Sequence, residues 1–267
     1  MRVIATGLSG TIGRHVQNAT SYFGDIRDPD GYDQLNGHDC FLHLAGVVGT
    51  KTVADSKKLA HEINVGATLK LAKEALSRNY SQFIYVSTSH VYGNASGDIT
   101  EETKAAPLTE YAFQKLKAEN QLREVFRNSP TKLVILRLFS ILGNEMPAFT
   151  LGGLLDQLTV DPSLKVSCSQ DVRDFLAPTQ AGASLTFLAH EEWSAEGTYN
   201  LCSGTGLSVK DASKMYLSTK GYTANENRFE PGYSPVPRIV GCNRKLISEI
   251  PGVQKYIAEF RPSMNEN

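Results

Sequence analysis

The sequence predicts a doubly wound parallel α/β sheet with a smaller, mixed α/β lobe beside it. Short apolar runs that end in glycines or polar loops alternate with helical patterns through residues 1–143. Such runs are typical of strands buried on both faces of a parallel sheet, and the alternation is typical of βαβ units. At 267 residues, the chain has the length of one large domain or of a domain with a smaller lobe.

The predicted elements follow one another in a regular order. A buried strand at residues 3–5 ends in a glycine-rich loop, and a helix of two or three turns follows at residues 11–19. A short apolar run at 20–23, a strand at 40–45 and an amphipathic helix at 59–76 come next. The last elements of this part are a strand at 83–86, a polar loop at 87–93, a helix that Pro107 opens and that continues to about residue 126, and a strand at 133–138.

The pattern changes after residue 143, where glycines and prolines separate short, mixed segments. Residues 181–190 and 198–202 carry patterns that return to the sheet. We therefore assign residues 1–143 and 175–203 to the sheet domain, and residues 144–174 and 204–267 to the smaller lobe.

Composition excludes several classes of protein. With 27 basic and 28 acidic residues, the net charge of −1 favours neither a nucleic acid nor an anionic membrane as partner. No apolar run approaches the roughly 18 residues that span a bilayer, and the N-terminal apolar stretch is too short for a signal peptide. The four cysteines form no CxxC pair and have no histidine at ligand spacing, which is typical of reduced thiols. We expect a cytoplasmic protein with no metal site.

Three glycines follow the first strand directly. Gly7, Gly10 and Gly13 form a GxxGxxG pattern between that strand and the predicted helix. In dinucleotide-binding loops one glycine makes the tight turn, one lets backbone N–H groups approach a pyrophosphate, and one lets helix and strand pack closely. A glycine-rich turn without a ligand is the alternative, but the position between strand and helix favours a dinucleotide site.

Tyr111 and Lys115 are four residues apart on the helix predicted at 107–126, so both lie on one helix face. A neighbouring ammonium should lower the pKa of a tyrosine from its ordinary value of about 10 and let it shuttle a proton near neutral pH. Thr88 follows the strand at 83–86, at the sheet edge where ligands of α/β proteins bind, and its hydroxyl could donate a hydrogen bond to a substrate oxygen. The YxxxK spacing also arises by chance in many helices. The interpretation of Tyr111 and Lys115 as a functional pair therefore depends on their place after the glycine loop.

These motifs stand in the order found in the extended short-chain dehydrogenase/reductases, and the sequence resembles their NAD(P)-dependent nucleotide-sugar epimerase/dehydratase members. TGLSGTIG (6–13) resembles the cofactor loop, GDIRD (24–28) the segment whose acid contacts the adenine, and HLAG (43–46) the loop that lines the cofactor. INVGAT (63–68) contains the helix asparagine, and STSHVYG (87–93) resembles the loop with the catalytic Ser/Thr. YAFQK (111–115), RDF (173–175) and YNLCSGTGLS (199–208) complete the resemblance.

The resemblance implies a Rossmann fold, here shortened in its first half, with NAD or NADP as the cofactor. The cofactor-binding residues that it implies are Gly7, Gly10, Thr11, Ile12, Gly13, Asp25, Ile26, Leu44, Ala45, Gly46, Asn64, Tyr111 and Lys115. It implies Thr88, Tyr111 and Lys115 as the catalytic set, and the smaller lobe as the substrate-binding part. The substrate-binding residues that it implies are Ser89, His90, Ser140, Arg173 and Arg238.

The activity that the resemblance implies is hydride transfer at a nucleotide sugar, at carbon 4, by an epimerase or a ketoreductase. Tyr111 would exchange the proton, Thr88 would hold the oxygen, and Lys115 would bind the nicotinamide ribose. Arg173 would pair with the diphosphate, whereas Arg238 could do so or be a surface charge. A homodimer is also implied. A catalytically silent dinucleotide-binding sensor or scaffold protein is the alternative, and the retained Tyr111 and Lys115 argue against it.

The sequence also departs from the family pattern. Only ten residues separate Gly13 from Gly24, so we expect the second strand to be deleted or reduced and the acid for the ribose 2′-hydroxyl to be missing. Arg14, His15 or Arg27 could receive a 2′-phosphate or simply be solvated, which leaves NAD and NADP both open. Ser140 replaces an asparagine of many relatives. Ser89-His90 replaces the Asp-Glu of sugar dehydratases, so dehydration is not expected, and His90 could contact the sugar or be an exposed loop histidine.

Overall fold

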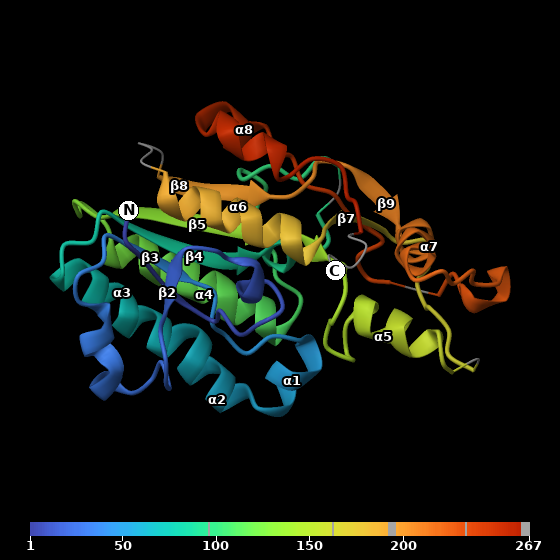
Figure 1. Cartoon of the computed structure of the whole chain (residues 1–267), viewed down its shortest axis with the longest axis horizontal. Helices are drawn as coiled ribbons and strands as arrows, with labels where there is room; N and C mark the ends of the chain where they lie inside the picture. Colours follow the sequence, from blue (N-terminus) through green and yellow to red (C-terminus); the bar gives the residue numbers. More distant parts are fainter. Residues whose placement is uncertain (96, 162, 192–195, 233, 263–267) are drawn as a thin grey trace.

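The computed structural model of the protein is built around a six-stranded parallel sheet (Figure 1). Its strands are β1 (Val3–Thr6), β2 (Ala19–Ser21), β3 (Cys40–His43), β4 (Gln82–Thr88), β5 (Lys132–Leu138) and β8 (Gly197–Leu201), in the order β2-β1-β3-β4-β5-β8. The structure describes residues 1–267 except 96, 162, 192–195, 233 and 263–267. All neighbouring strands of this sheet are parallel, which confirms the predicted doubly wound architecture.

Helices cover both faces of this sheet (Figure 1). One face carries α1 (Thr50–Asp55), α2 (Lys57–His61), α3 (Thr68–Ser77) and α4 (Glu110–Val125), and the other carries α6 (Pro178–His190) and α8 (Arg244–Glu249). Successive residues of β1 point to opposite faces of the sheet, and both faces are apolar. Ile4 packs into the apolar cluster of α3 and α4, whereas Ala5 packs into the cluster of α6 and α8. Among the described residues, no helix has both the length and the hydropathy to span a bilayer.

Two helices differ in extent from the sequence prediction. The amphipathic pattern at 59–76 is divided between α2, a π-helical turn (Glu62–Ala67) and α3, and Leu59 is 44% exposed. Helix α4 begins at Glu110 rather than at Pro107, because the Thr109 side chain accepts a hydrogen bond from the Ala112 N–H and so caps the helix three residues later.

The helix predicted at residues 11–19 is wrong. The glycine loop leads into a single 3₁₀ turn, η1 (Gly13–His15), and the chain turns at Asn18, with φ of 56°, into β2. Helix α6 packs directly on this turn, since a Cβ on Gly182 would lie 2.4 Å from the His15 Cβ. The second strand is reduced to three residues, in line with the short spacing between Gly13 and Gly24.

A second, four-stranded sheet lies beside the first. In it, β7 (Val172–Leu176) pairs in parallel with β6 (Ser140–Ile141) and β10 (Arg238–Ile239), and antiparallel with β9 (Gly206–Ser208). Helices α5 (Leu151–Leu158) and α7 (Val209–Thr219) pack on it around a separate apolar cluster. Leu246 of α8 and Val253 of η6 (Pro251–Lys255) belong to the cluster of the main sheet instead. The lobe boundaries assigned from the sequence stay a prediction, and residues 192–195, 233 and 263–267 within them lie outside the described residues.

Candidate active site

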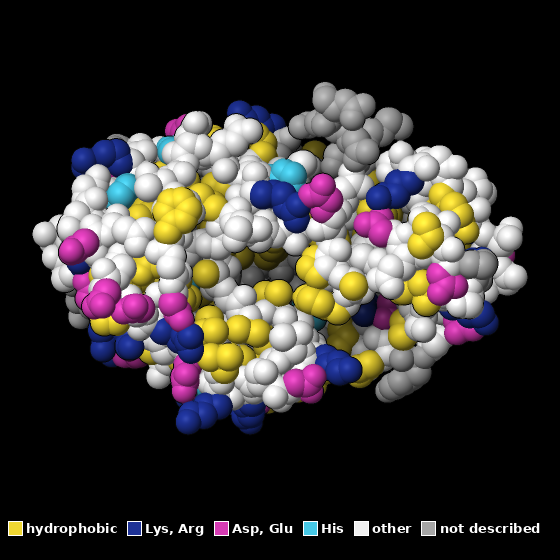
Figure 2. All heavy atoms as spheres, turned by 60° about the horizontal axis from the view of Figure 1, so that its bottom comes forward, with side chains coloured by type: hydrophobic (Ala, Val, Ile, Leu, Met, Phe, Trp, Pro, Cys, Tyr) yellow, Lys and Arg dark blue, Asp and Glu magenta, His cyan; other side chains and the backbone are white. Residues whose placement is uncertain are grey.

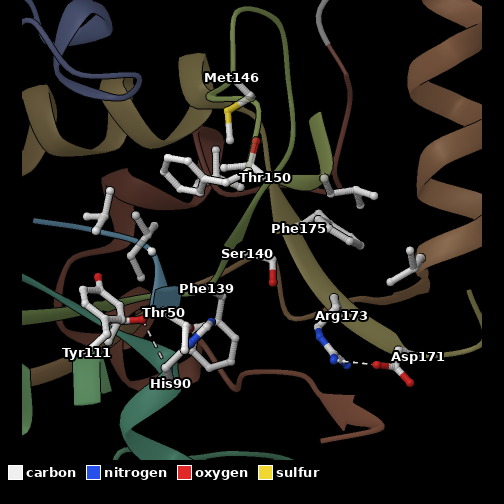
Figure 3. Close-up of a pocket in the computed structure, with 18 of the residues that line it drawn as sticks. Thr50, His90, Tyr111, Phe139, Ser140, Met146, Thr150, Asp171, Arg173 and Phe175 are labelled. Atoms are coloured by element: carbon white, nitrogen blue, oxygen red, sulfur yellow. Dashed lines mark hydrogen bonds and ion pairs between the residues drawn. The ribbon is translucent and has the colours of Figure 1, made fainter. Parts of the chain in front are cut away.

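Two adjoining cavities open at the carboxyl ends of the parallel strands. The first, the glycine-loop cavity, has a volume of about 410 Å³ and lies between the glycine loop and the loop that follows β3. The second, the large cavity, measures about 790 Å³ and extends to the second sheet (Figure 3). Figure 2 shows a hollow near the middle of one face of the molecule, edged by hydrophobic side chains. Val48, Ser87, Tyr111 and Leu138 line both cavities, so the two meet at Tyr111.

Close backbone packing shapes the glycine-loop cavity. A Cβ on Gly13 would lie 2.0 Å from the Gly7 carbonyl oxygen, and one on Gly7 would lie 2.7 Å from the Ala45 nitrogen. Asn64 fixes the opposite wall, because its Oδ1 accepts from the Val47 N–H at 2.8 Å. These positions need glycine because two loops cross without space for a side chain.

The wall of this cavity offers backbone donors. Ser9, Thr11 and Ile12 line it, and their backbone N–H groups have no hydrogen-bond partner among the described residues. Such donors suit an anionic ligand. Because η1 has only three residues, these N–H groups act without the dipole of a following helix.

Tyr111, Thr88 and Lys115 come together where the two cavities meet. Thr88 ends β4, and Tyr111 lies in the first turn of α4. Lys115 is 6% exposed, and its Nζ donates to the Val86 carbonyl oxygen at 2.7 Å and lies 4.1 Å from the centroid of the Tyr85 ring. The three side chains that the sequence predicts as a catalytic set therefore share one corner, at the end of β4.

The electrostatics of this corner differ from the sequence expectation. Burial raises the pKa of Tyr111 to about 12, although hydrogen bonding to Thr88 lowers it. Burial also lowers the pKa of Lys115 to about 7, while the Glu119 carboxylate raises it. The net shift of the Tyr111 pKa is therefore upward, and the group that lowers this pKa is Thr88 rather than the expected Lys115.

His90, Ser140 and Arg173 line the large cavity. Figure 3 shows Arg173 beside Asp171, and its Nη2 lies 2.8 Å from the Asp171 Oδ2. The ring of His90 meets that of Tyr111 edge-on, with 6.1 Å between centroids. Surrounding protein atoms and the Arg173 charge lower the pKa of His90, which is exposed towards the cavity.

Four residues predicted for the site lie outside both cavities. Asp25 is exposed and ion-paired with Arg27, and Ile26 is buried in the apolar core. Ser89 is 2% exposed and lines neither cavity. Arg238 is exposed on β10. The segment that carries Asp25 follows the three-residue β2, which pairs in parallel with β1.

Every other predicted cofactor-binding residue lines the glycine-loop cavity. Sequence patterns did not indicate the apolar wall of the large cavity, which consists of Val48, Leu138, Phe139, Ile141, Met146, Phe149, Leu151, Phe175 and Val209. They also missed Lys51 in this cavity and Glu119, which the i,i+4 spacing from Lys115 could have indicated. Among the described residues, no group of three or more His, Cys, Asp or Glu side chains could hold a metal ion.

Solved structures share this fold. RMD from Pseudomonas aeruginosa, complexed with NADPH, has a TM-score of 0.81 at 22% identity, covering 97% of each chain. UDP-glucuronic acid 4-epimerase from Bacillus cereus, in complex with UDP-glucuronic acid and NAD, has a TM-score of 0.82 at 20% identity, covering 99% of this chain and 95% of that one.

Sequence relatives are enzymes of nucleotide sugars. GDP-6-deoxy-D-mannose reductase of Pseudomonas aeruginosa is 27% identical over 240 residues, 80% of this chain and 78% of that protein. UDP-glucose 4-epimerase 2 of Oryza sativa subsp. japonica is 26% identical over 266 residues, 89% of this chain and 62% of that protein. Putative UDP-arabinose 4-epimerase 4 of Arabidopsis thaliana is 27% identical over 220 residues, 71% of this chain but only half (50%) of that protein. The profile described as "NAD dependent epimerase/dehydratase family" matches residues 11–202. The chain therefore belongs to the NAD dependent epimerase/dehydratase family.

Proposed function

We propose that the protein is an NAD(P)H-dependent ketoreductase that acts at carbon 4 of a nucleotide-linked keto sugar. The observation that carries this proposal is the meeting of the two cavities at Tyr111. One cavity has the free backbone donors of a dinucleotide loop, and the other has space for a sugar nucleotide. A proton donor between them can serve a substrate oxygen whose carbon receives a hydride from the other side.

The glycine-loop cavity fits the pyrophosphate and nicotinamide parts of the cofactor. Ser9, Thr11 and Ile12 would hold the pyrophosphate through their N–H groups, and Lys115 would bind the ribose next to the nicotinamide. The cofactor, when bound, supplies the hydride. Asp25 is tied to Arg27 outside this cavity, so the predicted contacts to the adenosine end are missing.

Tyr111 would be the proton donor. With its pKa raised to about 12, the phenol keeps its proton at neutral pH, which suits donation to a keto oxygen better than abstraction from an alcohol. Thr88, next to Tyr111 in the same corner, would hold that oxygen through its hydroxyl. This protonation state supports reduction as the working direction.

The large cavity would take the sugar nucleotide. Lys51 and Arg173 are its cations, and Arg173 would bind the diphosphate by exchanging Asp171 for phosphate oxygens. Ser140 and His90 are the polar groups that would contact the sugar. The likeness to a GDP-6-deoxy-D-mannose reductase and to UDP-sugar 4-epimerases supports a nucleotide sugar as the substrate class.

Turnover with Tyr111→Phe tests the proposed chemistry. The protein is mixed with NADH or NADPH and with UDP-, dTDP- and GDP-linked 4-keto sugars, and loss of the reduced nicotinamide is followed by absorbance. We expect Tyr111→Phe to lower kcat by about 10²- to 10⁴-fold while the cofactor Kd, from direct titration, is unchanged. Tyr222→Phe, in the second lobe, is the matched control. Cofactor binding without turnover of any keto sugar would support the silent sensor instead.

Mass spectrometry of the nucleotide released on denaturing fresh protein separates a reductase from an epimerase. A ketoreductase uses up its cofactor each cycle, so we expect protein that is empty or that exchanges its nucleotide with added NADPH. An NAD retained in equal amount to protein through dialysis would favour the epimerase.

A further inference from the structure

A buried carboxylate lies directly behind Lys115. Glu119 follows Lys115 by one turn on α4 and is 0% exposed. Its carboxylate accepts from the Ser87 hydroxyl at 2.5 Å and from the Arg137 Nη2 at 2.7 Å. Arg123 Nη2 donates to it at 3.0 Å. Burying a carboxylate costs free energy unless such partners surround it. None of the steps proposed above uses Glu119.

These contacts fix the end of β4. Ser87 and Arg137 are directly paired across β4 and β5, so one carboxylate bridges both strands to α4. The Arg137 guanidinium also lies 4.7 Å from the centroid of the Tyr92 ring. Thr88 and the first turn after it are thereby attached to the same network.

The network reaches Lys115 by two routes. Lys115 donates to the carbonyl oxygen of Val86, the residue before Ser87, so the strand end that Glu119 holds is the one that binds the ammonium. The second route is charge, because Glu119 raises the pKa of Lys115 against the effect of burial.

The other titratable groups facing Lys115 bring no compensating negative charge. Burial, with Tyr111 and Glu119 adding to it, raises the pKa of Tyr85 on β4 far above its ordinary value, and that of Tyr111 on α4 is about 12. Burial and the Lys115 charge lower the pKa of His43 on β3 to about 3, so its imidazole is neutral. Among the described residues facing Lys115, Glu119 is the anion.

We propose that Glu119 is a positioning residue for Lys115: it anchors the end of β4 through Ser87 and supplies the negative charge that favours the ammonium form of the Lys115 side chain, directed at the Val86 carbonyl oxygen. The effect of Glu119 on turnover rests on the role of Lys115 in the proposed reaction. The positioning itself does not, because the contacts of Glu119 exist without cofactor or substrate.

Pulse labelling with acetic anhydride tests it on the free protein. Acetylation of Lys115 is measured by peptide mass spectrometry across pH, because only the neutral amine reacts. We expect a midpoint near pH 7 in the native protein. In Glu119→Gln we expect it to fall by about one pH unit. Arg123→Ala, which leaves Glu119 paired with Ser87 and Arg137, is the matched control and should not lower the midpoint.

A second variant tests the proposal if Glu119→Gln fails to fold. Glu119→Gln leaves the Arg137 guanidinium buried without its anion, which is destabilising by itself. Glu119→Gln with Arg137→Gln removes both charges, and we expect the same fall in midpoint. An unchanged midpoint in either folded variant would overturn the proposal, whether or not the protein reduces keto sugars. In active enzyme, Glu119→Gln should lose more of its kcat at pH 8 than at pH 6, and Glu119→Asp should restore part of it.

Discussion

Arg14, the residue after the last glycine of the loop, forms an ion pair with Glu145 beside the large cavity. Its Nη2 also donates to the Glu145 carbonyl oxygen at 3.1 Å. Glu145 has φ of 53°, a left-handed conformation that few non-glycine residues adopt, so one guanidinium holds both the side chain and the backbone of a tight turn. The segment from this turn onward places Met146 and Phe149 in the cavity wall. The pair therefore links the cofactor loop to the proposed substrate site.

Arg14→Ala should weaken substrate binding with little effect on stability. Glu145 is 76% exposed, and pairs of this kind contribute at most about 1 kcal/mol, so we expect the KM for the sugar nucleotide to rise about two- to fivefold. Arg2→Ala breaks an exposed pair with Asp39 and is the control. Steady-state kinetics and thermal unfolding measure both effects. Equal KM values in the two variants would show that the Arg14 pair does not order the cavity wall.

Gly13→Ala should remove most of the cofactor affinity. The added methyl group would lie 2.0 Å from the Gly7 carbonyl oxygen, so the loop must move. Overpacking of this kind costs about 1–3 kcal/mol, which corresponds to a rise of about 5- to 150-fold in the Kd for NADH or NADPH. In Gly66→Ala, the control, the new methyl group meets nothing within 4 Å. Fluorescence titration of the reduced cofactor gives the Kd, and full affinity in Gly13→Ala would contradict the assigned loop.

The main-sheet strands along the chain could be predicted from the sequence because each of them is a local apolar run. The helix after the glycine loop was mispredicted for a physical reason that is not local. Glycine spacing alone is compatible with a helix, whereas the packing of Gly182 on His15 involves residues far apart in the chain. The prediction for Asp25 also depended on a motif alone, whereas its carboxylate pairs with Arg27 and lies outside both cavities.

The proximity of Thr88, Tyr111 and Lys115 was predictable because these residues lie in short motifs. The apolar wall of the large cavity was not, since Val48, Phe139 and Phe175 come from separate loops and strands and carry no pattern of their own. Burial also decides the charge state of Lys115, and burial appears only once the sheet and α4 are assembled.

Lys115→Met should stabilise the protein at neutral pH. The unfolded chain binds the lysine proton up to its ordinary pKa of 10.5, whereas the folded protein loses it near pH 7. The unfolded state therefore binds more protons between these values, and the stability contributed by this site rises with pH across that window. Below pH 7 the buried ammonium lowers the free energy of unfolding by its full amount, which is on the order of a few kcal/mol.

Urea unfolding of native protein and Lys115→Met at pH 7 and pH 9.5 measures this difference. We expect the variant to be more stable at pH 7, and the gap to narrow at pH 9.5. Lys117→Met, on the exposed side of the same helix, should change stability by no more than about 0.5 kcal/mol at either pH. A variant that is less stable than native protein at pH 7 would show that the contacts of Lys115 outweigh its desolvation.

The outer surface of α2 and α4 should hold two copies of the chain together. Leu59 on α2 is 44% exposed and Phe113 on α4 is 54% exposed. An ion pair between Lys57 and Glu110 at 2.8 Å joins the two helices, so these apolar side chains lie on neighbouring helices. In a two-fold interface the same surface of each copy meets its counterpart, so exposed apolar side chains such as these would be buried against each other. Light scattering should give twice the chain mass of 29.2 kDa for native protein and the single mass for Phe113→Asp. Val160→Asp, at a side chain that is 82% exposed beyond α5, should leave the dimer intact. Native protein at the single mass would exclude this interface.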